Sequence, residues 1–110
     1  MIEFEDRTRF LSVPTMEKYK EHGHSIYRTG KDGMTFFYLS LEDFERLYNS
    51  ELLWEWDGKY SLILDDYEEG VIDQDLLENL SIVEERLGES PVKDAFELAS
   101  RLGTAVYFYL

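Results

Sequence analysis

The sequence predicts an α+β fold in which a mostly antiparallel sheet, built from two hairpins and a C-terminal buried strand, packs with three to four helices. Three observations predict this class. Apolar residues recur at helical spacing in several segments, glycine-containing turns separate two pairs of strand-like segments, and the C-terminal segment is apolar on both faces. With 110 residues, of which 44% are hydrophobic and 15% aromatic, the chain suits one domain, residues 1–110, and leaves no room for a second core.

The N-terminal part is expected to contain two strands and a short helix. Ile2–Glu5 and Phe10–Val13 are predicted as edge strands. The short helix is predicted over Thr15–His22, and Gly23 suits the position at which such a helix ends.

The first hairpin is predicted between Ser25–Arg28 and Met34–Leu39, which flank a turn sequence that contains two glycines. A helix should follow it and run from a Ser40 cap to about Leu52, with Asp43 placed to complete a capping box. Its apolar residues fall on one helical face: Leu41, Phe44, Leu47 and Tyr48.

The second hairpin is predicted between Leu53–Trp56 and Lys59–Leu64. The dipeptide Asp57-Gly58 separates these segments, and such a dipeptide strongly favours the tight turn of a two-residue hairpin. On the first of these strands the two tryptophans of the chain would share one face of the sheet.

Two further helices are marked by their caps. One should begin near Asp73 and end before Gly88, whereas the other is capped by Ser90, has Pro91 in its first turn and ends at Gly103. The apolar stripe of the first contains Leu76, Leu77, Leu80, Val83 and Leu87, and that of the second contains Val92, Ala95, Phe96, Ala99 and Leu102.

The chain ends in a strand-like segment, Thr104–Leu110, whose apolar residues occupy both faces. A strand of this kind belongs in the interior of a sheet that is covered on both sides. The resulting order is hairpin, helix, hairpin, two helices and strand, which is typical of α+β proteins with an antiparallel sheet.

The net charge of −13 restricts the classes of partner. It is concentrated in residues 41–89, which carry 16 acidic and 3 basic side chains, whereas residues 1–31 carry 5 acidic and 6 basic ones. Nucleic acids and anionic membranes would be repelled by such a surface. The expected partner is therefore a basic protein, whose encounter the acidic field would accelerate.

Several kinds of chemistry are missing from the sequence. The chain has no cysteine, which excludes thiolate metal sites and cysteine nucleophiles and fits a cytoplasmic location. The acidic N-terminus does not have the pattern of a signal peptide. The histidines His22 and His24 supply too few ligands for a predicted metal site, although a His-x-His pair keeps a metal-binding alternative open. We expect no catalytic residues and no cofactor.

The candidate site is the segment from Trp54 to Glu78, in which carboxylates and aromatic side chains are interleaved and Lys59 is the only basic residue. The alternative is a solvated acidic loop followed by a helix start, where acids favour the helix dipole. Aromatic anchors beside charged groups are, however, typical of interface hot spots. The residues predicted to bind a partner are Glu55, Trp56, Asp57, Asp65, Asp66, Tyr67, Glu68, Glu69, Asp73 and Asp75.

In size, acidity, aromatic content, lack of cysteine and α+β pattern, the chain resembles bacterial toxin-immunity proteins of the colicin and contact-dependent-inhibition type. This resemblance rests on size and composition, and it assigns no individual residue. It implies tight, electrostatically steered binding to a basic toxin domain, often a nuclease, at its active site or an adjacent exosite. Two alternatives stay open: a phage-encoded nucleic-acid mimic, such as an anti-restriction or anti-CRISPR protein, and a small adaptor or metal-binding domain.

Overall fold

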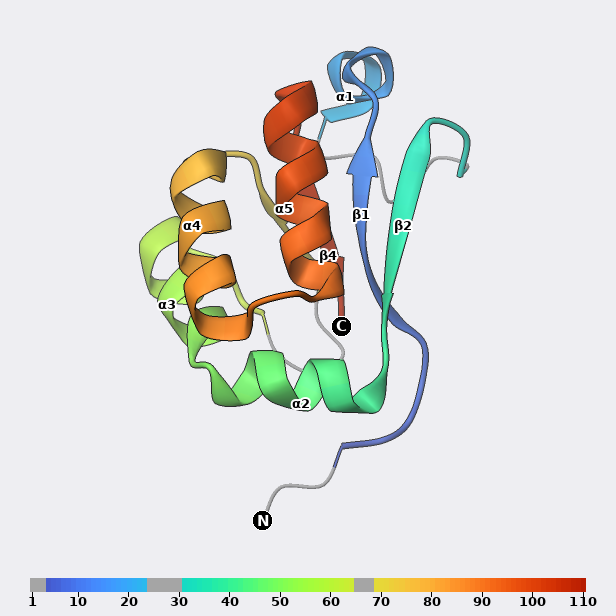
Figure 1. The fold of residues 1–110 in the computed structure, drawn as a ribbon. Coiled ribbons are helices and arrows are strands. Elements are labelled where there is room, and N and C mark those ends of the chain that lie inside the picture. The colour runs from blue at the N-terminus through green and yellow to red at the C-terminus, as the bar shows by residue number, and fades with distance from the viewer. Residues whose placement is uncertain (1–3, 24–30, 65–68) are drawn as a thin grey trace.

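The computed structural model of the chain describes residues 4–23, 31–64 and 69–110. Within these ranges the chain forms four strands and five helices, which confirms the predicted α+β class (Figure 1). In chain order they are β1 (Arg9–Pro14), α1 (Met16–His22), β2 (Met34–Leu39), α2 (Leu41–Asn49), α3 (Leu52–Tyr60), β3 (Glu69–Ile72), α4 (Leu76–Leu87), α5 (Pro91–Leu102) and β4 (Val106–Tyr109). The predicted strand Ser25–Arg28 and part of Ile2–Glu5 lie outside the described residues.

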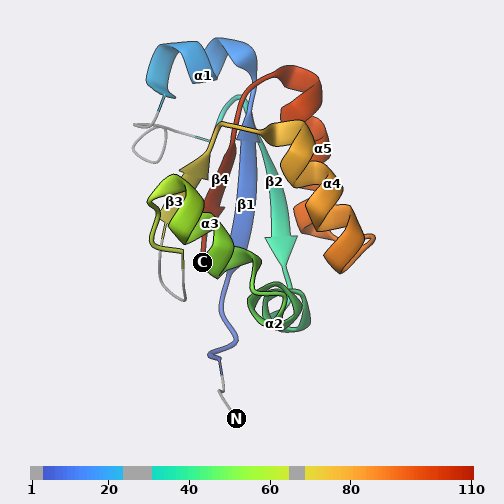
Figure 2. The ribbon, with the colours of Figure 1, turned by 90° about the vertical axis from the view of Figure 1, so that its left-hand side faces the viewer.

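The strands form one antiparallel sheet in the order β2-β1-β4-β3, so the first and last described strands lie side by side at its centre (Figure 2). The buried C-terminal strand is confirmed, because β4 pairs on both sides and Phe108 is inaccessible. Phe10–Val13, predicted as an edge strand, is central instead, because β1 pairs with both β2 and β4. Strand β3 lies in the acidic segment, where the sequence predicts no strand.

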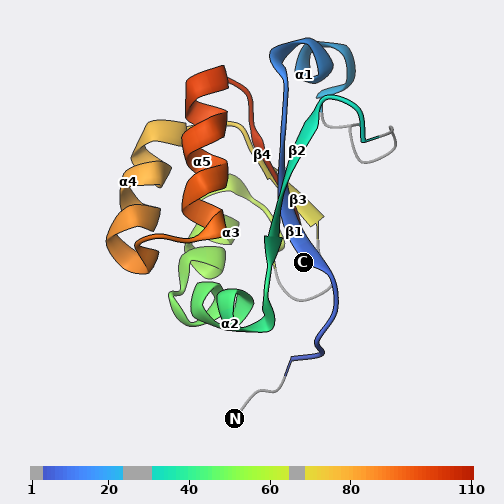
Figure 3. The same cartoon turned by 45° about the vertical axis from the view of Figure 1, so that its right-hand side comes forward.

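Helices α2 to α5 cover one face of the sheet, and α1 lies at one end of it (Figures 1 and 3). The main core lies between these four helices and the sheet, and it contains Leu11, Trp56, Phe96 and Phe108. A smaller cluster forms around Tyr107 where α1 approaches the opposite face. No helix in the described ranges has the length and apolar character needed to cross a bilayer.

The face of the sheet opposite the four helices carries a row of aromatic side chains. Successive residues of a strand point to opposite faces, so Phe10, Phe36, Tyr38 and Tyr109 lie together while their neighbours enter the core. The rings of Phe10 and Tyr109 stack with their centroids 4.9 Å apart, and Phe36 meets Phe10 edge-on at 5.3 Å. This face is therefore aromatic, whereas helices α2 to α5 carry ten acidic side chains.

The predicted N-terminal caps of two helices are confirmed, and a third helix also has a side-chain cap. Ser40 and Asp43 form a reciprocal capping box at the start of α2, with hydrogen bonds of 3.0 and 3.1 Å between each side chain and the other residue's backbone N–H. Ser90 accepts the backbone N–H of Lys93 at the start of α5. Thr15 caps α1 in the same way. Local sequence therefore determines where these helices begin.

The predicted hairpin over Leu53–Trp56 and Lys59–Leu64 is wrong, because Leu52–Tyr60 forms helix α3. Leucines 52 and 53 and Trp56 are buried on one side of this helix, at spacings of three and four residues. Left-handed backbone at Glu51 (φ 67°) and Ser61 (φ 55°) bounds the helix at both ends. The tertiary burial of this face thus overrides the turn preference of the Asp57-Gly58 dipeptide.

Gly58→Ala is expected to raise the free energy of unfolding by about 0.5–1 kcal/mol, because glycine is unfavourable inside a helix. A Cβ at this position meets nothing within 4 Å. In the hairpin turn the same substitution would destabilise the protein, because that turn needs a positive φ. Urea unfolding measures the difference. Gly103→Ala is the matched control, since Gly103 has φ 70° and alanine there should cost about 1 kcal/mol.

Two predicted core positions and several helix bounds also differ from the structure. Leu77 is 73% exposed, and Leu102 is exposed as well, although both were predicted in buried stripes. Asn79 is buried in place of Leu77, because α4 packs its Asn79 side against α3. Helix α2 ends at Asn49 rather than near Leu52, and α4 begins three residues after Asp73.

Raising the pH above about 10 is expected to destabilise the protein through Tyr107. Its hydroxyl donates a 2.7 Å hydrogen bond to the Gly23 carbonyl, and burial raises its pKa well above the ordinary value of 10.0. The unfolded chain therefore loses this proton at lower pH than the folded one. The stabilisation is complete below about pH 10 and is lost as the pH rises further. Urea unfolding at increasing pH measures this loss, which Tyr107→Phe should reduce; an unchanged decline would contradict the assignment.

Candidate partner-binding surface on helix α3

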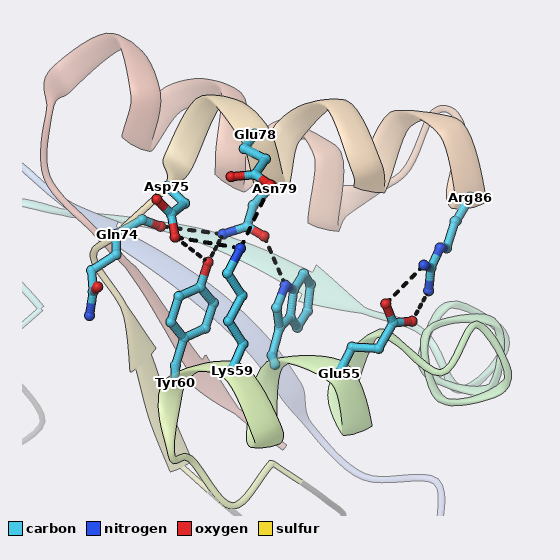
Figure 4. Close-up of polar contacts among 9 residues, drawn as sticks. Glu55, Lys59, Tyr60, Gln74, Asp75, Glu78, Asn79 and Arg86 are labelled. Atoms are coloured by element: carbon cyan, nitrogen blue, oxygen red, sulfur yellow. Dashed lines mark hydrogen bonds and ion pairs between the residues drawn. The ribbon is translucent and has the colours of Figure 1, made fainter.

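Helix α3 is fixed against α4 by a partly buried polar network centred on Asn79 (Figure 4). The indole N–H of Trp56 donates to Asn79 Oδ1 at 3.0 Å, and Asn79 Nδ2 donates to Tyr60 Oη at 2.9 Å and to the Gln74 carbonyl at 3.3 Å. Tyr60 in turn donates its hydroxyl proton to Asp75 Oδ2 at 2.9 Å. Burial raises the pKa of Tyr60, so its hydroxyl keeps this proton to a higher pH than an exposed tyrosine does.

Two sets of ion pairs lie on either side of this network. Arg86 of α4 forms a two-pronged contact with the Glu55 carboxylate, and its hydrogen bonds lower the pKa of Glu55. Lys59 Nζ lies 3.6 Å from Asp75 and 3.7 Å from Glu78 (Figure 4). These half-exposed pairs orient α3 on α4 more than they stabilise the fold, because solvent screens them.

The three basic side chains of residues 41–89 each join two parts of the helical layer. Arg86 and Lys59 link α4 to α3, and Arg46 of α2 donates to the Leu87 carbonyl at the end of α4 at 2.6 Å. Helices α2, α3 and α4 carry eight acidic side chains, which outnumber these three cations. The helical layer therefore presents a strongly negative surface to solvent.

Trp54 is the most exposed aromatic side chain in the described part of the chain, at 76%. It lies on the outer side of α3, opposite Trp56, which is 2% exposed and packs against Phe96 and Phe108. Trp56 was predicted to bind a partner, and this is wrong because its side chain is enclosed by the core. Trp54, the exposed tryptophan, was not among the predicted partner-binding residues. The spacing of Leu52, Trp56 and Tyr60 could have identified it, because this spacing is helical and leaves position 54 outside.

The other predicted binding residues within the described ranges do not all lie together. Glu55 and Asp57 flank Trp54 on α3, and Asp75 lies at the α3–α4 contact. Asp73 instead accepts a 3.0 Å hydrogen bond from Tyr19 of α1, and Glu69 lies on β3 opposite Tyr109. The remaining predicted residues lie outside the described ranges: Asp65, Asp66, Tyr67 and Glu68.

The outer surface of α3 offers an exposed indole and two carboxylates. Across residues 4–23, 31–64 and 69–110, no group of three or more histidine, aspartate or glutamate side chains is arranged to hold a metal ion. The α3 surface combines an accessible indole, which supplies apolar contact area, with carboxylates that attract cations. A rigid helix carries both, because the Asn79 network and the ion pairs hold α3 in place.

Comparison of the chain with protein-family models, curated proteins and solved structures gives no match.

Proposed function

We propose that this protein is an acidic inhibitor that binds a basic protein through the outer surface of α3. The observation that carries the proposal is the exposed indole of Trp54, set among carboxylates on a helix that is fixed to α4. A tryptophan exposed to this extent leaves most of its apolar area in water, and burying that area on a partner is favourable. Tryptophan is also among the residues most enriched in binding hot spots.

The charge of the protein supports a basic partner. At a net charge of −13, long-range attraction would raise the association rate with a cationic surface, and salt would lower it. Ile63 is also largely exposed, one residue before the buried Leu64, and adds apolar area next to the α3 segment. The combination of an apolar anchor and a surrounding negative field suits a tight protein–protein contact.

The partner that we propose is a bacterial toxin domain, which makes this chain an immunity protein of the cytoplasm. Its size, acidity and α+β class fit that role. A toxin nuclease carries a basic cleft, and an inhibitor anchored by Trp54 would cover that cleft or an exosite beside it. A nucleic-acid mimic instead needs carboxylates spaced along a face as phosphates are, whereas Trp54 interrupts the acids of α3 with an apolar ring.

The first experiment is capture of partners from the source organism by the tagged protein, at physiological and at high salt, with identification by mass spectrometry. We expect a basic, toxin-like protein in a one-to-one complex that high salt weakens, and we expect the added inhibitor to abolish its activity. A large nucleic-acid-processing assembly, or an empty capture, would contradict the proposal.

The decisive variants act on that complex. Trp54→Ala should weaken binding by about 30-fold, which corresponds to a hot-spot loss of about 2 kcal/mol. Glu51→Gln should slow association more than Glu97→Gln, which removes the same charge from an exposed position on α5. Unchanged affinity with Trp54→Ala would exclude α3 as the binding surface.

A further inference from the structure

Trp54 separates two surface depressions that differ in charge. The first is lined by Trp54, Glu55, Asp57, Gly58 and Lys59. The second is lined by Tyr48, Glu51, Leu53, Trp54, Asp57 and Leu64, and we call it the Trp54–Leu64 depression. Lys59 lines the first depression, whereas the described residues that line the second include two acidic side chains and no basic one.

The Trp54–Leu64 depression has apolar walls and an acidic rim. Its aromatic walls are Tyr48 and Trp54, and the buried Leu53 and Leu64 contribute to its floor. Its volume of about 320 Å³ lies at the lower end of the range for ligand pockets, about 300–1,000 Å³. A depression of this size suits one side chain of a partner better than a cofactor.

The two rim carboxylates belong to Glu51 and Asp57. Asp57 Oδ1 accepts a 2.6 Å hydrogen bond from the Leu64 backbone N–H, so the carboxylate is held in place where the chain leaves α3. Glu51 is exposed, and the left-handed backbone at this residue (φ 67°) sets the turn between α2 and α3. The rim therefore offers negative charge around an apolar interior, with one of its two carboxylates pre-positioned.

We infer that the Trp54–Leu64 depression binds an arginine side chain of the partner, an inference that rests on the proposed function. The aliphatic stem of arginine fits apolar walls, and its planar guanidinium stacks on aromatic rings and pairs with carboxylates. An apolar side chain would remove water from Glu51 and Asp57 without replacing their hydrogen bonds. Lysine fits less well, because its compact ammonium is strongly hydrated and does not stack.

The first test uses N-acetyl-arginine amide as a probe and the amide and indole resonances of the ¹⁵N-labelled protein as the readout. We expect saturable shifts of the Trp54 indole N–H and of the Leu53 and Leu64 amides, with the buried Trp56 indole unchanged. Trp54→Phe assigns the indole signal. N-acetyl-lysine amide should bind several-fold more weakly, and Glu51→Gln should weaken the arginine probe by about two- to fivefold.

Three outcomes of this test would overturn the inference. They are equal binding of the arginine and lysine probes, shifts confined to the Gly58 and Lys59 amides of the first depression, and no shift at Trp54. None of them bears on whether a basic protein binds the α3 surface, because the probe carries only one side chain.

The second test separates the inference from the proposed function by using the captured partner. Each arginine on the partner's surface is replaced by lysine, alone and together with Trp54→Ala. We expect one replacement to weaken the complex by at least about tenfold and to have little further effect once Trp54 is absent. If Trp54→Ala weakens the complex but no arginine does, the inference fails and the proposed function stands. If Trp54→Ala has no effect on any basic partner, the proposed binding surface fails.

Discussion

Trp56→Ala should lower the free energy of unfolding by about 3–5 kcal/mol, whereas Trp54→Ala should change it by no more than about 0.5 kcal/mol. The two residues are separated by a single position in the sequence, but their surroundings differ. The ring centroid of Trp56 lies 5.4 Å from that of Phe96 and 5.5 Å from that of Phe108, whereas Trp54 is exposed. Truncation of Trp56 therefore leaves a cavity and removes a buried hydrogen bond, while truncation of Trp54 leaves only solvent.

Chemical denaturation followed by far-ultraviolet circular dichroism measures both values without relying on tryptophan fluorescence. Each variant serves as the control for the other, because both remove an indole from the same helix. Similar losses for the two variants would contradict helix α3, since a strand would place the two side chains on one face and in similar surroundings.

Asn79→Ala should cost about 1–3 kcal/mol, because it leaves the buried indole N–H of Trp56 without its acceptor. In a Trp56→Phe background, where that donor is absent, Asn79→Ala should cost about 1 kcal/mol less than it does in the original protein. Urea unfolding of the four proteins of this cycle measures it.

Gln74→Ala is the matched control for the Asn79 network. Gln74 takes part through its backbone carbonyl, so removal of its exposed side chain should leave the free energy of unfolding nearly unchanged. An equal cost of Asn79→Ala in both tryptophan backgrounds would show that the indole–amide hydrogen bond contributes nothing measurable.

The elements predicted correctly are those whose ends carry local signals. Ser40 with Asp43, and Ser90 with Pro91, define helix starts through hydrogen bonds and backbone geometry that involve only neighbouring residues. The apolar C-terminal strand is also recognisable, because a strand with two apolar faces has to be enclosed. Boundaries set by left-handed residues, such as Glu51, were missed since nothing in their side chains requires that conformation.

The error at α3 changed the candidate site as well as the fold. The Asp57-Gly58 pair favours a turn locally, but burial of Leu52, Leu53 and Trp56 in the core favours a helix. The free energy gained by this burial outweighs the local turn preference, so the segment is helical. Because of the same error, Trp56 was predicted to contact a partner, and Trp54 was not distinguished from it. The sequence gives the number of acidic residues but not their distribution in space, because Glu69 lies on β3 and Asp73 contacts Tyr19 of α1.

In helix α3 and its N-cap, neighbouring positions are under different evolutionary constraints. Substitutions at Trp56 are limited by packing, whereas the side chains of Trp54 and Glu51 are exposed and packing constrains them less. Under the proposed function, a lineage can therefore change the binding surface at these exposed positions while the same sheet and helices persist. Rapid divergence at positions 51 and 54, beside a nearly constant residue 56, is the signature that this arrangement should leave among descendants of the chain.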